Sequence, residues 1–157
     1  MEVKETNGDK TDLGLLLLRV AGLVLCFTFG IEKLGWVSHY IGSGKPWDAF
    51  PLAGLIRNVG FPFATVLAIF AILCESLFAL LVALGIYTRT FSILIAVCMM
   101  GALYTSIRIN DPLVSKNSAM EYIIIFGAIA ILGPGKLTVG RYLRMVFAGK
   151  GNKTWLI

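Results

Sequence analysis

Charged residues are scarce in this sequence. Of its 157 residues, 15% are Asp, Glu, Lys or Arg, whereas 57% are hydrophobic. A soluble domain of this size needs a polar surface to cover its core, and too few charged side chains are present to supply one. The composition therefore excludes an ordinary soluble protein and favours a chain embedded in lipid.

Residues that bind metals are equally scarce. His39 is the only histidine, and Cys26, Cys74 and Cys98 are the only cysteines. One His supplies neither a two-imidazole haem site nor a zinc site, and the cysteines form no C-x-x-C motif. We therefore predict no metal and no cofactor bound by this chain. The cysteines are interpreted as structural thiols, with redox or metal chemistry as the less favoured alternative.

Motifs of soluble enzymes and of nucleic-acid-binding proteins are also missing. The sequence has no Gly-rich phosphate loop, no nucleophile elbow and no carboxylate pair in a polar segment. Its net charge of +5 is small, and basic residues mix with aromatic ones only near the end of the chain. We therefore expect contact with an anionic lipid surface and no binding of nucleic acid.

Long apolar runs are what the chain does have. A membrane-spanning helix needs about 20 mostly apolar residues to cross roughly 30 Å of hydrocarbon. Four such segments are separated by Gly, Pro, Asp and Asn clusters. We predict an all-α polytopic membrane protein, a single domain over 1–157, folded as an antiparallel bundle of four transmembrane helices. The predicted helices cover about 13–34, 61–86, 91–107 and 118–132, with an outer loop at 35–60 and a basic interfacial tail at 136–157.

The distribution of Lys and Arg predicts how the chain is oriented. Eight of them lie on the side of the two termini and of the turn that contains Arg89, against five on the other side. Because cytoplasmic loops carry the excess of basic residues, both termini are expected in the cytoplasm. The expected location is the inner (cytoplasmic) membrane.

Two charged residues lie deep within the predicted helices. Arg19 is in the first helix and Glu75 in the second, and ionisable groups at such positions usually face the bundle interior and pair. We predict an ion pair between Arg19 and Glu75. Structural pairing and a role in binding a ligand or carrying a proton are equally compatible with this pattern.

A second group of charges is predicted near the opposite face. Glu32 and Lys33 end the first helix, Arg108 ends the third and Glu121 opens the fourth. Either Lys33 or Arg108 is expected to neutralise Glu121. Since charges at helix ends usually sit among lipid headgroups, we interpret this outer polar cluster as structural.

Small residues predict where the helices approach one another, because helix interfaces in lipid depend on close packing. The candidates are Gly14, Ala21, Gly22, Gly30, Ala71, Ala79, Ala83, Gly101, Ala102, Gly127 and Ala128.

Four sequence segments together resemble a known family. They are LLLLRVAGLVL with Arg19, FGIEKLGW with Gly30 and Lys33, CESLFALLVALGIYTR with Glu75, Gly85, Thr88 and Arg89, and EYIIIFGAIAILGPGKLTV with Glu121, Tyr122, Gly133, Pro134, Gly135 and Lys136. In this order and spacing, over about 15–143, they resemble the DoxX family of small four-helix membrane proteins. Members of that family often have a His where this chain has Phe29.

The resemblance implies association with membrane redox systems, such as thiosulfate:quinone oxidoreductases, sulfur metabolism and oxidative-stress complexes. We therefore expect an accessory subunit of a membrane redox or electron-transfer complex, with a quinone or lipid near Arg19 and Glu75. Its expected partners are the lipid bilayer and either larger membrane redox subunits or further copies of itself. One alternative is a catalytic, quinone-linked oxidoreductase subunit in which Glu75 carries protons. Another is a small-solute transporter, although four helices are few and no inverted repeat is visible.

Overall fold

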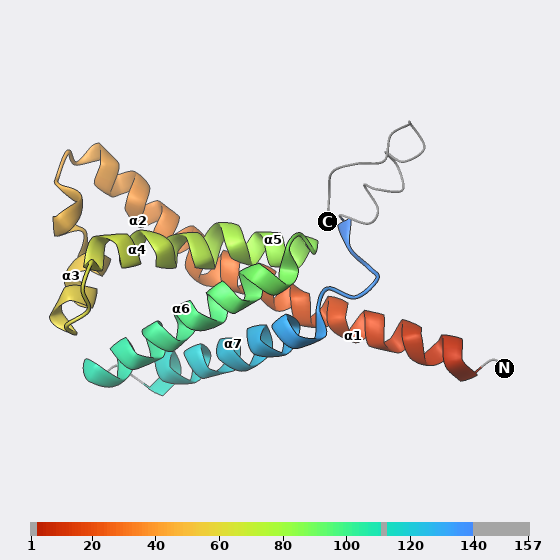
Figure 1. Ribbon diagram of the computed structural model, residues 1–157. Coiled ribbons are helices and arrows are strands. Elements are labelled where there is room, and N and C mark those ends of the chain that lie inside the picture. Colours follow the sequence, from red (N-terminus) through yellow and green to blue (C-terminus); the bar gives the residue numbers. More distant parts are fainter. Residues whose placement is uncertain (1–2, 111–112, 140–157) are drawn as a thin grey trace.

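Helices make up all the regular structure that the computed structural model describes, which covers residues 3–110 and 113–139 (Figure 1). This confirms the all-α class. In chain order the elements are α1 (Val3–Leu25), π-helix η1 (Cys26–Gly30), α2 (Ile31–Gly42), 3-10 helix η2 (Trp47–Ala49), α3 (Pro51–Asn58), α4 (Ala64–Leu73), π-helix η3 (Cys74–Phe78), α5 (Ala79–Leu84), α6 (Thr88–Arg108) and α7 (Leu113–Leu132).

Three stretches of the described chain are long and apolar enough to cross a membrane. They are Lys10–Gly42, Ala64–Leu84 and Thr88–Arg108. The fourth predicted span falls within α7, which is not among these three stretches. A fourth crossing, and with it the four-span bundle, therefore stays a prediction.

The helices differ in extent from the sequence prediction. The first runs through α1, η1 and α2 without a break, so it begins before residue 13 and continues past Gly35. An exposed Gly costs a helix only about 1 kcal/mol, which the surrounding helix-forming residues can offset. The predicted outer loop at 35–60 is consequently shortened by the end of α2, and it also holds α3.

The other predicted helix starts also shift. The second helix begins at Ala64 and not at 61, because Phe63 adopts a left-handed conformation with φ 53° and Pro62 lies before the helix. Helix α6 begins at Thr88, three residues earlier than predicted, and α7 begins at Leu113 instead of 118. Most of the predicted interfacial tail lies outside the described residues, which end at 139.

Two π-helical turns interrupt the first two long helices. In η1 the backbone N–H of Ile31 donates to the carbonyl of Cys26, and in η3 that of Ala79 donates to the carbonyl of Cys74. Each bond spans five residues instead of four, so one extra residue is accommodated in the turn. Such π-bulges are rare and often found at functional sites.

Both π-helices contain the same kind of hydrogen bond from a side chain to the backbone. The third residue of each is a hydroxyl side chain that donates to the carbonyl four residues earlier. Thr28 donates to Val24 at 2.5 Å, and Ser76 donates to Ile72 at 2.6 Å. Because a π-turn disturbs the regular ladder, these hydroxyls supply hydrogen bonds where water is scarce.

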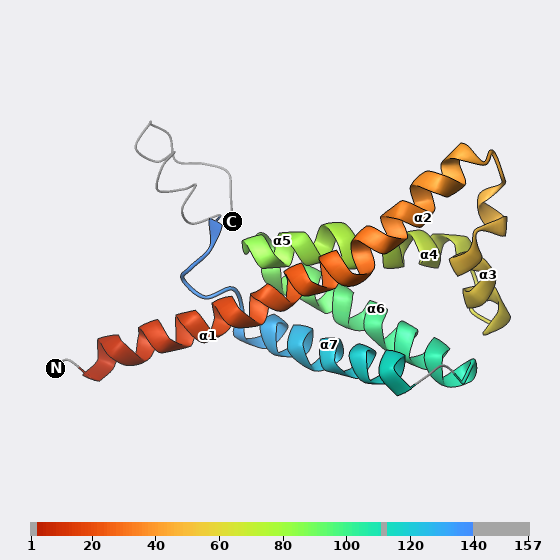
Figure 2. The ribbon, with the colours of Figure 1, turned by 180° about the vertical axis from the view of Figure 1, so that it is seen from behind.

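The helices pack around one main core. Figures 1 and 2 show the long α1–η1–α2 helix crossing α4–η3–α5, with α6 and α7 side by side below them. The first turns of α1 extend beyond the other helices. The buried residues of this core are Leu25, Cys74, Ala79, Val82, Ile95, Met99, Phe126 and Ile129.

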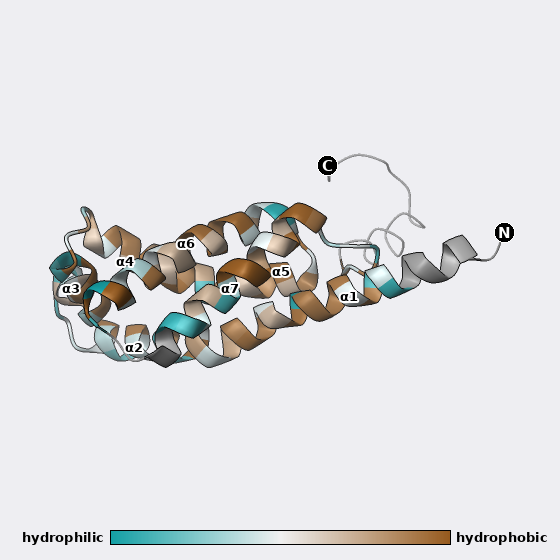
Figure 3. Ribbon diagram, turned by 90° about the horizontal axis from the view of Figure 1, so that it is seen from below, coloured by the Kyte–Doolittle hydropathy of each residue, from teal (hydrophilic) through white to brown (hydrophobic). Residues whose placement is uncertain are grey.

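Large apolar side chains also cover the outside of the molecule. Phe27 is 65% exposed, Val66 64% and Ile124 71%, and brown, hydrophobic segments recur along the helices in Figure 3. Water does not tolerate an apolar surface of this extent, whereas lipid does. The exposed apolar faces therefore agree with a protein that crosses the membrane several times.

A second, smaller core lies at the α3 end of the molecule. Phe50 and Ala53 of this segment are buried against α4. The ring of Tyr40 packs at 5.2 Å from that of Phe50, and its hydroxyl donates to the carbonyl of Pro46 at 2.7 Å. Aromatic residues with an apolar ring and a hydrogen-bonding tip are typical of the membrane interface.

Candidate functional site

The two π-helices meet at the point of closest approach between the first two long helices. A methyl group placed on Gly30 would collide with the carbonyl oxygen of Glu75 and would lie 2.9 Å from the Cα of Ser76. Only glycine fits there, because the backbone of η3 occupies the space of a side chain. Gly22, two turns earlier, touches the Ala79 carbonyl of α5 in the same way.

Gly22, Cys26 and Gly30 follow one another at intervals of four residues along one face of the first helix. This small-xxx-small spacing lets helix backbones pack closely in a membrane. Gly22 and Gly30 were predicted as contact points, and the structure confirms both. Other predicted contacts are wrong: a side chain at Gly14, Gly101 or Gly127 would meet nothing within 4 Å.

Lys33 reaches Glu75 from the first helix. Its Nζ lies 2.5 Å from Oε2 of Glu75, and the side chains are 18% and 5% exposed, respectively. Lys33 is three residues beyond Gly30, so the glycine contact brings its helix close enough for the lysine to reach the carboxylate. We call Lys33 and Glu75 the bulge pair.

The bulge pair lies near the middle of a membrane-length helix, where burying a charge is unfavourable. Glu75 is near the middle of the 21-residue stretch Ala64–Leu84 and is 4% exposed. A lone carboxylate there would lose its hydration with little in return, whereas an ammonium group at hydrogen-bond distance offsets much of that loss. The pair therefore allows an acid to exist among apolar side chains.

Arg19 is not the partner of Glu75, so the predicted ion pair is wrong. Arg19 is 1% exposed, and its guanidinium lies beside Gly85, where a methyl group would be 2.6 Å from Nη1. Gly85 is ten residues beyond Glu75, roughly 15 Å along a helix. The long Arg side chain points to the end of α5 and away from the carboxylate.

Arg19 instead holds the chain that follows α7. Its Nη2 donates to the carbonyl oxygen of Leu137. Its Nε is buried without a hydrogen-bond partner among the described residues, as are the hydroxyls of Thr88 and Ser92 on α6. This end of the molecule therefore contains polar atoms in the interior whose hydrogen bonds the described protein groups do not complete.

Asp12, two turns before Arg19 on α1, also binds the segment that follows α7. Its Oδ1 accepts the backbone N–H of Lys136 at 2.9 Å, and its Oδ2 lies 3.7 Å from the Lys136 ammonium. Gly135, with φ 71°, leaves room for Asp12 and Leu15, since a methyl group would be 3.2 Å from the carboxylate. We call Asp12, Arg19 and residues 133–137 the end clasp.

The predicted outer polar cluster does not form as expected. Lys33 binds Glu75 and therefore does not neutralise Glu121. Glu32, Arg108 and Glu121 are exposed, and no ion pair within the described part of the chain includes any of them. Arg108 instead lies over the ring of Tyr104, with 5.9 Å between its Cζ and the ring centroid.

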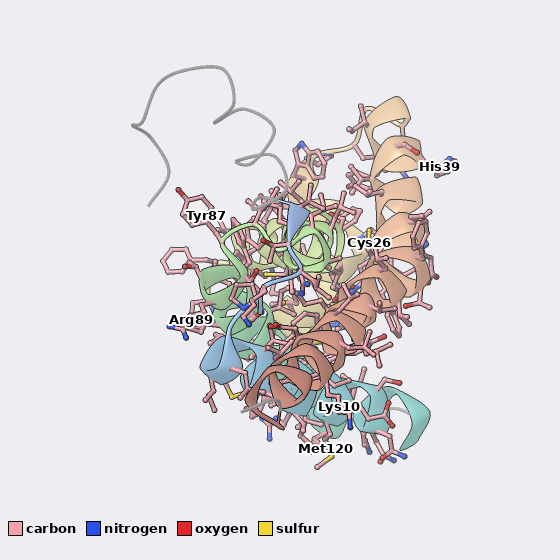
Figure 4. All side chains as sticks on the ribbon, turned by 90° about the vertical axis from the view of Figure 1, so that its right-hand side faces the viewer. Lys10, Cys26, His39, Tyr87, Arg89 and Met120 are labelled. Atoms are coloured by element: carbon pink, nitrogen blue, oxygen red, sulfur yellow. The ribbon has the colours of Figure 1, made fainter. Side chains whose placement is uncertain are left out.

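His39 takes no part in either polar site. It is exposed on α2 and points away from the bundle (Figure 4). Tyr87, just before α6, also projects outward in this view, whereas the guanidinium of Arg89 lies beside Gly133, where a methyl group would be 3.1 Å from its Nε. Within the described residues, no three His, Cys, Asp or Glu side chains are grouped so as to hold a metal ion.

The sequence contained a signal for the bulge pair that the prediction did not use. Gly30 was expected to be a close contact, and Lys33 lies one turn further on the same face. The π-helices themselves had no such signal, because the apolar pattern of a helix hardly changes when one turn gains a residue.

One comparison with known proteins identifies a family. The DoxX family model matches residues 14–107, which contain both π-helices and the bulge pair. The chain belongs to the DoxX family. The match ends before α7, so the similarity of the Gly-Pro-Gly segment stays a resemblance. Comparisons with curated proteins and with solved structures gave no match.

Membership of the DoxX family, together with the three membrane-length helices, shows that this is a multi-pass membrane protein. The family match also places Gly30, Lys33 and Glu75 inside the region that defines the family. The bulge pair is thus part of the DoxX domain of this chain, and it is our candidate functional site.

Proposed function

We propose that this DoxX protein is the membrane subunit of a redox complex, and that the bulge pair is where a quinone headgroup and its protons meet the protein. The single observation that carries the proposal is a carboxylate and an ammonium group held together in mid-membrane, where two π-helices touch. Intramembrane ionisable groups are expensive and are usually kept for function.

The chemistry of the pair suits a quinone. Lys33 supplies a hydrogen-bond donor for a quinone carbonyl oxygen, and Glu75 supplies a carboxylate that can pass on a proton when the quinone takes up electrons. Lys33 retains 18% exposure of its side chain, whereas Glu75 is nearly enclosed. A headgroup arriving through the lipid would therefore meet the ammonium first.

The proposal includes a fourth crossing by α7 and cytoplasmic termini. Helix α7 has 20 residues, or about 30 Å of length, and lies along α6. The excess of Lys and Arg near the end clasp supports a cytoplasmic, inner-membrane orientation. Reporter fusions after Gly44 and after Val139 test this: activity of a cytoplasmic reporter only at Val139 supports it, and the reverse pattern contradicts it.

An accessory role is tested by isolating the tagged chain from its native membrane in mild detergent. We expect it to bring down protein subunits with flavin, haem or iron–sulfur absorption, and a quinone in the organic extract. Glu75→Gln should reduce the quinone content several-fold, while Glu121→Gln, a change at an exposed carboxylate, should leave it unaltered. Recovery of a homo-oligomer without redox subunits and without quinone would overturn the proposal.

A catalytic role is the second candidate, because Glu75 is enclosed at a depth from which it could carry protons. Quinone reduction by the isolated complex distinguishes the two. A loss of ten-fold or more in Glu75→Gln with the complex still intact favours catalysis by this subunit. An unchanged rate in an intact complex favours the accessory role.

A further inference from the structure

Two clefts lie next to each other at the end of the molecule opposite the first turns of α1. Figures 1 and 2 show α3, the start of α4 and the end of α6 gathered at this end. The first cleft has a volume of about 320 Å³ and the second of about 270 Å³. Phe61 lines both of them, so the two clefts adjoin at this residue. The larger one is within the size range of small-molecule sites in proteins.

Apolar side chains line much of the two clefts. Phe63 is 81% exposed and Val66 is 64% exposed, and both line the first cleft. Tyr104 lines the second cleft, and its ring packs edge-on against that of Phe61 with 5.3 Å between the centroids. The clefts lie at the ends of two membrane-length stretches, the level at which headgroups meet acyl chains. A ligand that fits there has an apolar part that remains in lipid.

Two arginines bring positive charge to the clefts. Arg57 lines the first cleft, and the guanidinium of Arg108 lies over the ring of Tyr104 in the second. Both arginines are exposed, and no carboxylate of the described residues forms an ion pair with Arg108. A guanidinium group suits phosphate because it donates two parallel hydrogen bonds. The polar part of the ligand is therefore expected to carry a phosphate.

One carboxylate also lines the first cleft. Oδ1 of Asp48 lies 3.7 Å from Nη2 of Arg57 and accepts the hydroxyl of Thr65 at 2.7 Å. Nη1 of Arg57 donates to the backbone carbonyl of Asp48 at 3.3 Å. These contacts hold the Arg57 side chain at the cleft. Together, Arg57, Arg108 and Asp48 leave a single net positive charge, which one phosphodiester neutralises.

We propose that the two clefts together bind one molecule of an anionic phospholipid of the phosphatidylglycerol type, with its phosphate held by Arg57 and Arg108. Its acyl chains lie against Phe63 and Val66. The phosphodiester of phosphatidylglycerol carries one negative charge, whereas zwitterionic phosphatidylcholine and phosphatidylethanolamine would leave the positive charge of the site uncompensated. The site is separate from the bulge pair, so this inference goes beyond the proposed function and does not depend on it.

Native mass spectrometry of the full chain tests the lipid assignment. The chain is purified in detergent, freed of bound lipid and mixed with phosphatidylglycerol, phosphatidylcholine or phosphatidylethanolamine. We expect one tightly bound phosphatidylglycerol per chain, with an affinity about ten-fold higher than for either zwitterionic lipid, the size of effect expected of a charge-assisted hydrogen bond. Equal affinity for the three lipids would overturn the proposal. So would displacement of the lipid by glycerol phosphate, which has the phosphate but no acyl chains.

Three substitutions locate the site. Arg57→Gln and Arg108→Gln should each weaken phosphatidylglycerol binding about ten-fold, because each removes one guanidinium group from the phosphate. Lys45→Gln is the matched control, since Lys45 is exposed and lines neither cleft, and it should leave the affinity unchanged. An equal loss in Lys45→Gln would indicate attraction by overall charge, and no loss in the arginine variants would place the lipid elsewhere. Either result overturns the proposal.

Asp48→Asn separates direct contact with the lipid from support of the cleft. The substitution removes a negative charge, while the new amide oxygen can still accept the hydroxyl of Thr65. The affinity for phosphatidylglycerol should therefore rise. If Arg57 acted only by holding Asp48 in place, this variant would lose binding as Arg57→Gln does, and that loss would contradict the proposal.

Discussion

The bulge pair and the end clasp hold their buried charges in different ways. Glu75 lies mid-membrane and is met by the full opposite charge of Lys33. The side chain of Arg19, on α1, is buried to a similar extent. Its guanidinium, however, lies at the C-terminal end of α5 and donates to the carbonyl of Leu137. The carbonyl end of a helix carries partial negative charge, which favours a cation there. The two buried charges thus differ in their partners: Glu75 has a full counter-charge, and Arg19 has backbone carbonyl groups at a helix end.

The largest effect should come from breaking the bulge pair. Lys33→Met leaves the Glu75 carboxylate buried without its counter-charge, and such losses cost about 3 kcal/mol or more. We expect a markedly lower thermal unfolding midpoint in detergent. Lys45→Met, at an exposed lysine, should leave the midpoint unchanged. Equal midpoints for the two variants would show that the pair contributes nothing to stability.

The next largest effect should come from separating the two π-helices. Gly30→Ala puts a methyl group against the Glu75 carbonyl, so the helices must move apart, at a cost of about 2 kcal/mol. Gly35→Ala is the control, because a methyl group there meets nothing within 4 Å and alanine favours the helix. A Gly30→Ala protein that resists dodecyl sulfate as well as Gly35→Ala would contradict the close approach.

Arg19→Met should cost less than Lys33→Met. The substitution removes a hydrogen bond to Leu137, but it also removes a buried charge that has no carboxylate partner among the described residues. A loss of about 1 kcal/mol is expected in the same unfolding assay. A loss as large as that of Lys33→Met would mean that both charges depend on full ion pairs.

The smallest effect should come from Lys136, whose ammonium group lies at the outer part of the end clasp, and Asp12 provides the comparison. Asp12→Ala removes the acceptor of the Lys136 backbone N–H, which should cost about 1 kcal/mol. Lys136→Ala keeps that N–H and loses only an ammonium group that is 66% exposed, so its effect should be close to zero. Proteolysis in detergent, followed at the segment after α7, compares the two. Identical cleavage of both variants would contradict the role of the Asp12 carboxylate.

The helical fold was largely predictable because apolar runs report membrane spans directly. The three stretches of membrane length all overlap predicted spans. The starts of the helices were less predictable: Phe63 ends the irregular segment in a left-handed conformation that no pattern signals. The continuation past Gly35 was missed because a glycine was taken to end the helix.

The site residues were predictable individually, and their pairing was not. Arg19, Lys33 and Glu75 were all expected in polar clusters. Arg19 was assigned to Glu75 because both residues lie deep within neighbouring predicted helices. The register is instead set by Gly22 and Gly30, whose contacts place Lys33 beside Glu75 and Arg19 beside Gly85. Contacts between backbones fix which charges meet, and they depend on packing that single-helix patterns do not contain.

The arrangement of buried charges is tested most directly by a pair of double-mutant cycles on unfolding in detergent. One cycle combines Lys33→Met with Glu75→Leu, and the other combines Arg19→Met with Glu75→Leu. We expect a coupling of about 2 kcal/mol or more for Lys33 and Glu75, and near zero for Arg19 and Glu75. A large coupling between Arg19 and Glu75, with little between Lys33 and Glu75, would contradict the pairing on which the proposed function rests.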